Sequence, residues 1–131
     1  MPPIGLSELV LIVADVPTSA RFYRELVGLR PETEPTEAWA WFSCGRANQR
    51  LALHKGPLLF EEHSPLPAGR RFGPIHFALE AARTDLPAMV DRLRRAGITV
   101  HGPTRLDWMK AESFYFYDPD ANLVEFWSPD P

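Results

Sequence analysis

Three ionisable side chains stand inside short apolar segments of the chain: Glu8, His76 and Glu125. Carboxylate and imidazole groups are costly among apolar neighbours unless something compensates them, and a bound cation does so. Nitrogen and oxygen ligands of this kind suit Mn, Fe, Co, Ni or Zn. Three protein ligands also leave positions for water or substrate, as a catalytic metal site requires. We therefore predict one divalent metal ion at these residues, against the alternative that Glu8 and His76 are only hydrogen-bonded residues lining a cleft.

An internal repeat relates two of the three positions. Segment 6–13 (LSELVLIV) recurs 68 positions later as segment 74–81 (PIHFALEA), so Glu8 and His76 occupy the same slot of each half. Each segment is expected to form a strand that leads through a short turn into an amphipathic helix. Because segment 6–13 is apolar on both faces of such a strand, we expect it to be buried on both sides.

Turn and capping residues divide the rest of the chain into similar halves. In the first half, the cluster 15–19 is typical of a helix start, the helix is expected over 19–27, and Gly28 ends it. In the second half, residues 84–87 open a helix that Gly97 closes. The remaining strands are expected at 30–34, 38–43, 50–54, 99–101, 113–117 and 122–127.

The predicted fold is α+β, with two βαβββ modules that form a curved mixed sheet around a central cleft. Module one spans about 4–55, a linker rich in Pro and Gly spans about 56–72, and module two spans about 73–128. With 131 residues, the chain fits one compact domain with a substantial core.

Composition excludes several classes of function. The net charge is −3 with intermixed signs, so no basic stripe indicates nucleic acid. Cys44 is the single cysteine, which excludes a disulfide framework. No signal peptide or membrane-spanning apolar stretch is evident, and we expect a cytoplasmic protein.

Two stretches resemble the vicinal oxygen chelate superfamily of glyoxalases, extradiol dioxygenases and bleomycin resistance proteins. They are residues 13–29 (VADVPTSARFYRELVGL) and 114–125 (FYFYDPDANLVE). The resemblance implies paired βαβββ modules around a metal cleft, with metal ligands at Glu8, His76 and Glu125. Many members have His where this chain has Glu8.

The chain also departs from the patterns of the best-known members. Ala52 falls at the slot that in glyoxalase-type members holds a fourth ligand, and His54, two residues on, is a substitute base candidate. Tyr115 stands ten residues before Glu125, as in the extradiol dioxygenase pattern, and is the other catalytic candidate. The His expected before Tyr115 is absent, since Leu, Asp and Trp occupy 106–108.

Two functions follow as hypotheses. The first is a metal-dependent lyase, isomerase or dioxygenase that acts on a small oxygen-chelating substrate. The second is a metal-free binding protein of the bleomycin resistance kind, with Trp39, Trp41 and Trp108 as candidate walls of an aromatic cleft. In either case a small-molecule partner and a homodimer are expected, with no nucleic acid and no membrane.

Overall fold

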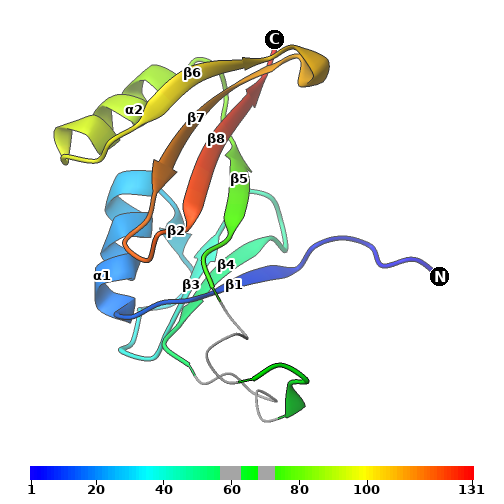
Figure 1. The fold of residues 1–131 in the computed structure, drawn as a ribbon, viewed down its shortest axis with the longest axis vertical. Helices are drawn as coiled ribbons and strands as arrows, with labels where there is room; N and C mark the ends of the chain where they lie inside the picture. The colour runs from blue at the N-terminus through cyan, green and yellow to red at the C-terminus, as the bar shows by residue number, and fades with distance from the viewer. Residues whose placement is uncertain (57–62, 68–72) are drawn as a thin grey trace. The chain divides into compact units, whose positions relative to one another are not determined.

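The computed structural model describes residues 1–56, 63–67 and 73–131, and the chain forms two compact units. The first unit is Met1–Glu25 with Leu29–Gly73, and the second is Leu26–Gly28 with Pro74–Pro131. Each unit contains one four-stranded mixed sheet and one principal helix (Figure 1). Most of the predicted linker, at 57–62 and 68–72, lies outside the described residues.

The first unit follows the order strand, helix, three strands. Its sheet has the strand order β1-β4-β3-β2, in which β1 is parallel to β4 and the other neighbours are antiparallel. A parallel pair needs a crossover connection, which α1 begins. The elements are β1 (Glu8–Ile12), α1 (Val16–Arg21), β2 (Arg30–Pro31), β3 (Trp39–Ser43) and β4 (Arg50–His54).

The second unit repeats this plan with the strand order β5-β8-β7-β6, and β5 is parallel to β8. The elements are β5 (His76–Glu80), α2 (Leu86–Arg95), β6 (His101–Leu106), β7 (Ala111–Tyr117) and β8 (Leu123–Pro129). The predicted α+β class and the two βαβββ modules are therefore confirmed, with one sheet in each module. None of the helices among the described residues is long and apolar enough to span a membrane.

The first helix begins earlier than predicted, at Val16 instead of residue 19, and continues as a π-helical segment over Phe22–Val27. Asp15 is the N-cap, because its carboxylate accepts hydrogen bonds from the backbone N–H and the hydroxyl of Thr18. These two bonds lower the pKa of Asp15, the hydroxyl bond having the larger effect. Gly28 ends the helix with a φ of 94°, as its position predicted.

Each sheet buries one face and leaves the other more open. In the first unit Phe42 and Leu51 are buried on the face that also meets Tyr23, and in the second unit Phe116 and Phe126 pack edge to face. The prediction that the first strand is buried on both sides is wrong: Glu8 is exposed and its same-face neighbours are only half-buried.

Several strand bounds also differ from the prediction. Strand Arg50–His54 is confirmed, whereas β2 ends at Pro31 and β6 begins only at His101. The shift of β6 coincides with an irregularity in its pairing with β7, where Gly102 has a φ of 130°. At that glycine a Cβ would lie 2.8 Å from the Ser113 carbonyl oxygen, so the close approach requires glycine.

Candidate functional site

Strand register places the candidate ligands at equivalent positions of the two sheets. Glu8 and His76 are the first residues of β1 and β5. Two residues further, the β1 strand pairs with Ala52 and the β5 strand pairs with Glu125. Ala52 is thus the structural equivalent of Glu125, and the first unit lacks the carboxylate that the second unit has.

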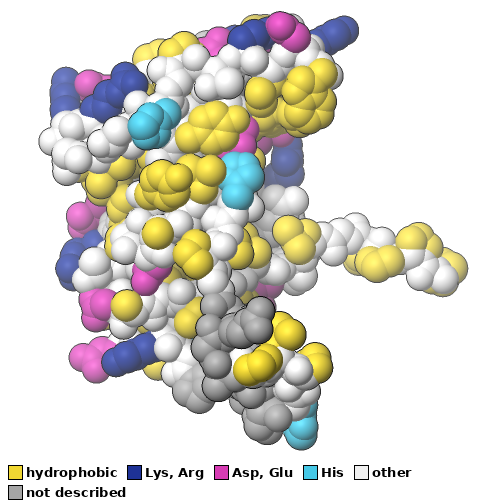
Figure 2. Space-filling model, viewed as in Figure 1, with side chains coloured by type: hydrophobic (Ala, Val, Ile, Leu, Met, Phe, Trp, Pro, Cys, Tyr) yellow, Lys and Arg dark blue, Asp and Glu magenta, His cyan; other side chains and the backbone are white. Residues whose placement is uncertain are grey.

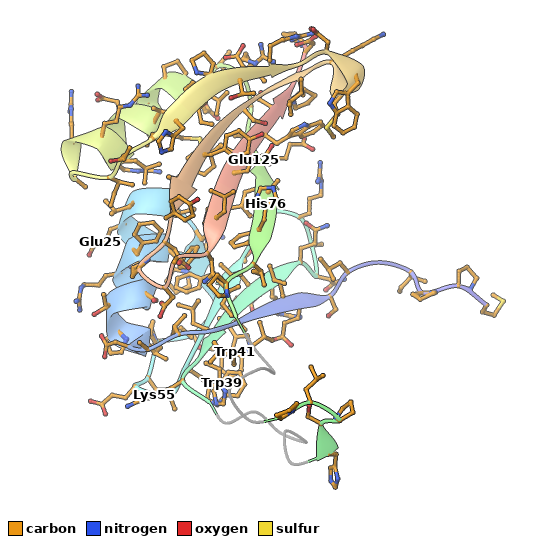
Figure 3. The ribbon with its side chains drawn as sticks, viewed as in Figure 1. Glu25, Trp39, Trp41, Lys55, His76 and Glu125 are labelled. Carbon is orange, nitrogen blue, oxygen red and sulfur yellow. The ribbon has the colours of Figure 1, made fainter. Side chains whose placement is uncertain are left out.

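His76 and Glu125 come together on the open face of the second sheet. His76 Nε2 lies 3.1 Å from Glu125 Oε1, and Figure 3 shows the two side chains beside each other on β5 and β8. The Glu125 side chain is buried, with 8% of it exposed, whereas half of the His76 side chain is exposed. The expectation that all three ligands are buried therefore holds for Glu125 and is wrong for Glu8 and His76.

The second ring nitrogen of His76, Nδ1, also has a hydrogen-bond partner. Nδ1 lies 3.2 Å from the carbonyl oxygen of Leu123, which can only accept a hydrogen bond. Nδ1 therefore donates in that bond. Without a metal ion, the 3.1 Å contact with the carboxylate of Glu125 requires a proton on Nε2 as well, and a metal ion would take the place of that proton. A histidine metal ligand typically has such a backbone contact at its other nitrogen.

The spacing of these two side chains fits a shared metal ion. An imidazole nitrogen and a carboxylate oxygen 3.1 Å apart could both reach one ion, since metal bonds to such atoms are about 2.0–2.2 Å long. Among the described residues, no three His, Cys, Asp or Glu side chains are grouped around one point. The described residues therefore bring together two ligand-capable side chains, His76 and Glu125, without a third beside them.

Tyr115 lies next to this pair. It is the cross-strand partner of Glu125 in the β7–β8 register, and its ring centre is 6.2 Å from that of His76. Cross-strand partners share a face of the sheet, so the Tyr115 hydroxyl belongs to the same open surface. In the space-filling view, a surface histidine and hydrophobic side chains lie together over the region of β5, β7 and β8 (Figure 2).

Glu8 belongs to the first unit and has its own neighbours there. The indole Nε1–H of Trp41 donates to Glu8 Oε1 over 2.9 Å. The two side chains line a cavity of about 300 Å³ together with Arg50, whose Nε donates to Glu32 over 2.8 Å. Two carboxylates and one guanidinium leave this cavity with a formal charge of −1.

An aromatic stack occupies the open face of the first sheet. Trp39 and Trp41 (Figure 3) are parallel with ring centres 4.9 Å apart. The ring centre of His54 lies 3.6 Å from that of Trp39. His54 is buried, and its Nδ1 accepts a hydrogen bond from the N–H of Gly56. Trp108 lies in the second unit, on a 3-10 turn, with 82% of its surface exposed.

Sequence reasoning missed two side chains that hold the candidate ligands. Ser113 donates to Glu125 Oε2 over 2.5 Å, and Trp41 donates to Glu8. For Ser113 a signal was present, because it precedes Tyr115 by two residues and so shares its face of the strand. For Trp41 the strand pattern gives no indication of which neighbour its indole N–H reaches.

The chain can now be assigned to a protein family. Residues 5–126 match the model of the Glyoxalase/Bleomycin resistance protein/Dioxygenase superfamily, and the chain is a member of this family. The predicted family resemblance is therefore confirmed.

Two relatives are similar to the chain along most of its length. Glutathione transferase FosA of Serratia marcescens is 28% identical over 121 residues, which cover 92% of this chain and 78% of the relative. Virulence protein STM3117 of Salmonella typhimurium is 30% identical over 123 residues, which cover 92% of this chain and 81% of the relative. The crystal structure of the Salmonella protein matches with a TM-score of 0.74, covering 99% of this chain and 100% of that one.

The same fold also serves proteins described as binders. TnmS3, an antibiotic binding protein from Streptomyces sp. CB03234, matches with a TM-score of 0.71 and 22% identity over 99% of both chains. At this level of identity the match concerns the fold alone. The side chains must therefore decide between the functions that the family contains.

Proposed function

We propose that the protein is a divalent-metal-dependent enzyme of the glyoxalase/dioxygenase type that acts on a small oxygen-chelating substrate. The observation that carries this proposal is the His76–Glu125 pair, in which an imidazole nitrogen and a carboxylate oxygen lie 3.1 Å apart with the outer atoms of both side chains already hydrogen-bonded. Glu8 is the proposed third ligand. Mn, Fe, Co, Ni or Zn suits this donor set.

The charges of the proposed ligands support this assignment. Two carboxylates neutralise a divalent ion, which offsets the cost of enclosing it together with the buried Glu125. When bound, the ion supplies a Lewis acid for two substrate oxygens. Three protein ligands leave positions at which these oxygens can bind.

The chain's own residues supply the remaining roles. Tyr115, on the surface beside Glu125, is the proposed hydrogen-bond donor or acid toward the substrate. His54 stays a weaker base candidate, because its ring is buried against Trp39 and its Nδ1 is occupied by Gly56. Because Gly56 donates to Nδ1, this nitrogen can accept a substrate proton only after that hydrogen bond breaks.

Metal content tests the proposal directly. Purified protein is expected to retain about one equivalent of a divalent metal, measured by elemental analysis after gel filtration. Glu125→Ala should reduce this to a small fraction, while Glu25→Ala, which removes an exposed carboxylate from the first helix, should leave it unchanged. Unchanged metal content in Glu125→Ala would show that the proposed site is wrong.

Mixed dimers test whether one chain or two build the site. If Glu8 of one subunit completes the His76–Glu125 pair of another, then mixing Glu8→Ala and Glu125→Ala proteins after unfolding and refolding restores some sites. Half of the dimers are then mixed, each has one intact site, and about a quarter of all sites bind metal. If each chain builds its own site, the mixture binds no more metal than the two variants alone.

The second candidate is a metal-free binding protein, and the Trp39–Trp41–His54 stack supports it. Parallel indoles beside a cavity of about 300 Å³ are suited to a planar aromatic ligand. A thermal-shift screen separates the candidates. Stabilisation by bleomycin with no response to Mn²⁺, Fe²⁺, Co²⁺, Ni²⁺ or Zn²⁺ would favour the binding protein and contradict the enzyme.

A further inference from the structure

We propose that Ser113 is a positioning residue for Glu125 and that it restricts this carboxylate to binding metal through one oxygen. The inference rests on the function proposed above, because it assigns a role around the same ligand. Ser113 lies on β7, two residues before Tyr115, and its side chain is fully buried.

The hydrogen bond between Ser113 and Glu125 has a defined direction. Ser113 Oγ is 2.5 Å from Glu125 Oε2, and an ionised carboxylate can only accept. The hydroxyl proton therefore lies on Ser113 and is donated to the carboxylate. Hydrogen bonds of this length between a hydroxyl and a carboxylate belong to the strong, charge-assisted kind.

The two oxygens of Glu125 thus have different partners. Oε2 accepts a hydrogen bond from the Ser113 hydroxyl, and both groups are buried. Breaking this bond would leave a buried polar group without a partner, which is costly. Oε1 faces His76, half of whose side chain is exposed, so this oxygen is accessible to an incoming ion. Glu125 then contributes a single ligand atom. A carboxylate that binds through both oxygens would occupy one more coordination position, which here remains open for substrate.

The other sheet provides an internal comparison. Register relates Trp41 to Tyr115, so Trp39, two residues earlier, is the equivalent of Ser113. Trp39 carries no hydroxyl, and the sheet has Ala52 where Glu125 would be. The buried hydroxyl is therefore found in the half that contains the carboxylate, as a positioning role requires.

Two buried serines give a matched pair for the test. Ser113→Ala removes the hydroxyl donor to Glu125, and Ser128→Ala removes an equally buried hydroxyl on β8 that accepts from Arg83 instead. Isothermal titration of the metal-free proteins with Mn²⁺ should show affinity weaker by about 10- to 100-fold for Ser113→Ala, the range for lost outer-shell partners. Ser128→Ala should stay within about twofold of the wild type. Ser113→Thr, which keeps the hydroxyl, should recover most of the affinity.

A second measurement separates positioning from general stability. Thermal unfolding of the metal-free proteins reports the effect of each lost hydroxyl on the fold, and we expect both alanine variants to unfold at lower temperature than the wild type. Only Ser113→Ala should lose Mn²⁺ affinity. If the wild type binds Mn²⁺ and Ser113→Ala binds it equally well, the role of Ser113 is refuted and the metal site stands. If the wild type binds none of the five metals, the proposed function and this inference both fail.

Discussion

Substitution of Gly28, at the end of the first helix, should lower the free energy of unfolding by an amount that can be estimated and compared with that for Gly45. Gly28 has a φ of 94°, and a Cβ at this position would lie 2.8 Å from Nη2 of Arg92. Arg92 donates to the carbonyl oxygens of Leu26 and Val27, which belong to the same compact unit as α2. Gly28→Ala should therefore strain the backbone and also displace the guanidinium.

The two costs can be estimated separately. Left-handed backbone costs a residue with a Cβ about 1–2 kcal/mol. Losing two partly exposed hydrogen bonds adds about 1–2 kcal/mol, at about 0.5–1 kcal/mol each. The expected total for Gly28→Ala is about 2–4 kcal/mol.

Gly45 is the matched control. Its φ of 96° is nearly the same, but nothing lies within 4 Å of a Cβ there. Gly45→Ala should therefore cost only the backbone part, about 1–2 kcal/mol. Urea unfolding of both variants followed by fluorescence, with Arg92→Ala alone and combined with Gly28→Ala, gives a double-mutant cycle.

The cycle gives a clear refutation. We expect a coupling of about 1–2 kcal/mol between Gly28→Ala and Arg92→Ala, because both remove the same hydrogen bonds. Equal destabilisation by Gly28→Ala and Gly45→Ala, with no coupling to Arg92, would show that the contacts of Arg92 do not stabilise the fold.

Three further predictions follow from particular side chains. Ala121 has a φ of 66°, so Ala121→Gly should stabilise the protein by about 0.5–1 kcal/mol in urea unfolding, the relieved strain less the added freedom of the unfolded chain; a lower urea midpoint would contradict this. Hydrogen bonds from Arg105, and secondarily from Arg83, lower the pKa of Asp130 to about 2. Because the pKa of Asp130 is lower in the folded than in the unfolded protein, its ionised carboxylate stabilises the fold fully above about pH 4, and this stabilisation is lost as the pH falls toward 2. Asp130→Asn should therefore lose less thermal stability than the wild type between pH 5 and pH 2. Trp41→Phe removes the donor to Glu8 and should weaken Mn²⁺ binding about tenfold in the same titration as for Ser113, whereas unchanged affinity would argue against Glu8 as a ligand.

The repeat was the part of the fold that the sequence could predict well. Glu8 and His76, which are 68 positions apart, both begin five-residue strands, and register confirms that Ala52 is the equivalent of Glu125, as the family resemblance implied. Alternation along a strand determines which residues share a face, and this period is independent of tertiary context. Alternation put Tyr115 and Tyr117 on one face of their strand, and only the register shows that this is the face of Glu125.

The exposures and partners of the same residues could not be predicted. Alternation does not say whether a face is covered, so Glu8 and His76 were expected to be buried and are exposed. His54 lies at the end of its strand beside Lys55 and is nevertheless buried under an indole, which alternation does not indicate. Such contacts depend on the rotamers of long side chains across two strands, which a pattern in one strand does not contain.

The equivalent positions of the two sheets hold side chains of different kinds. In the second sheet, a small buried residue, Ser113, leaves room for Glu125 to reach His76. In the first sheet the equivalent positions hold Trp39 and Ala52, and the indole stacks on His54 in place of a carboxylate contact. Where the second sheet has a serine and a carboxylate, the first sheet therefore has an indole and an alanine, and its surface at these positions is aromatic. The second unit therefore carries the His76–Glu125 pair, and the first unit carries an aromatic surface with Trp41 beside Glu8.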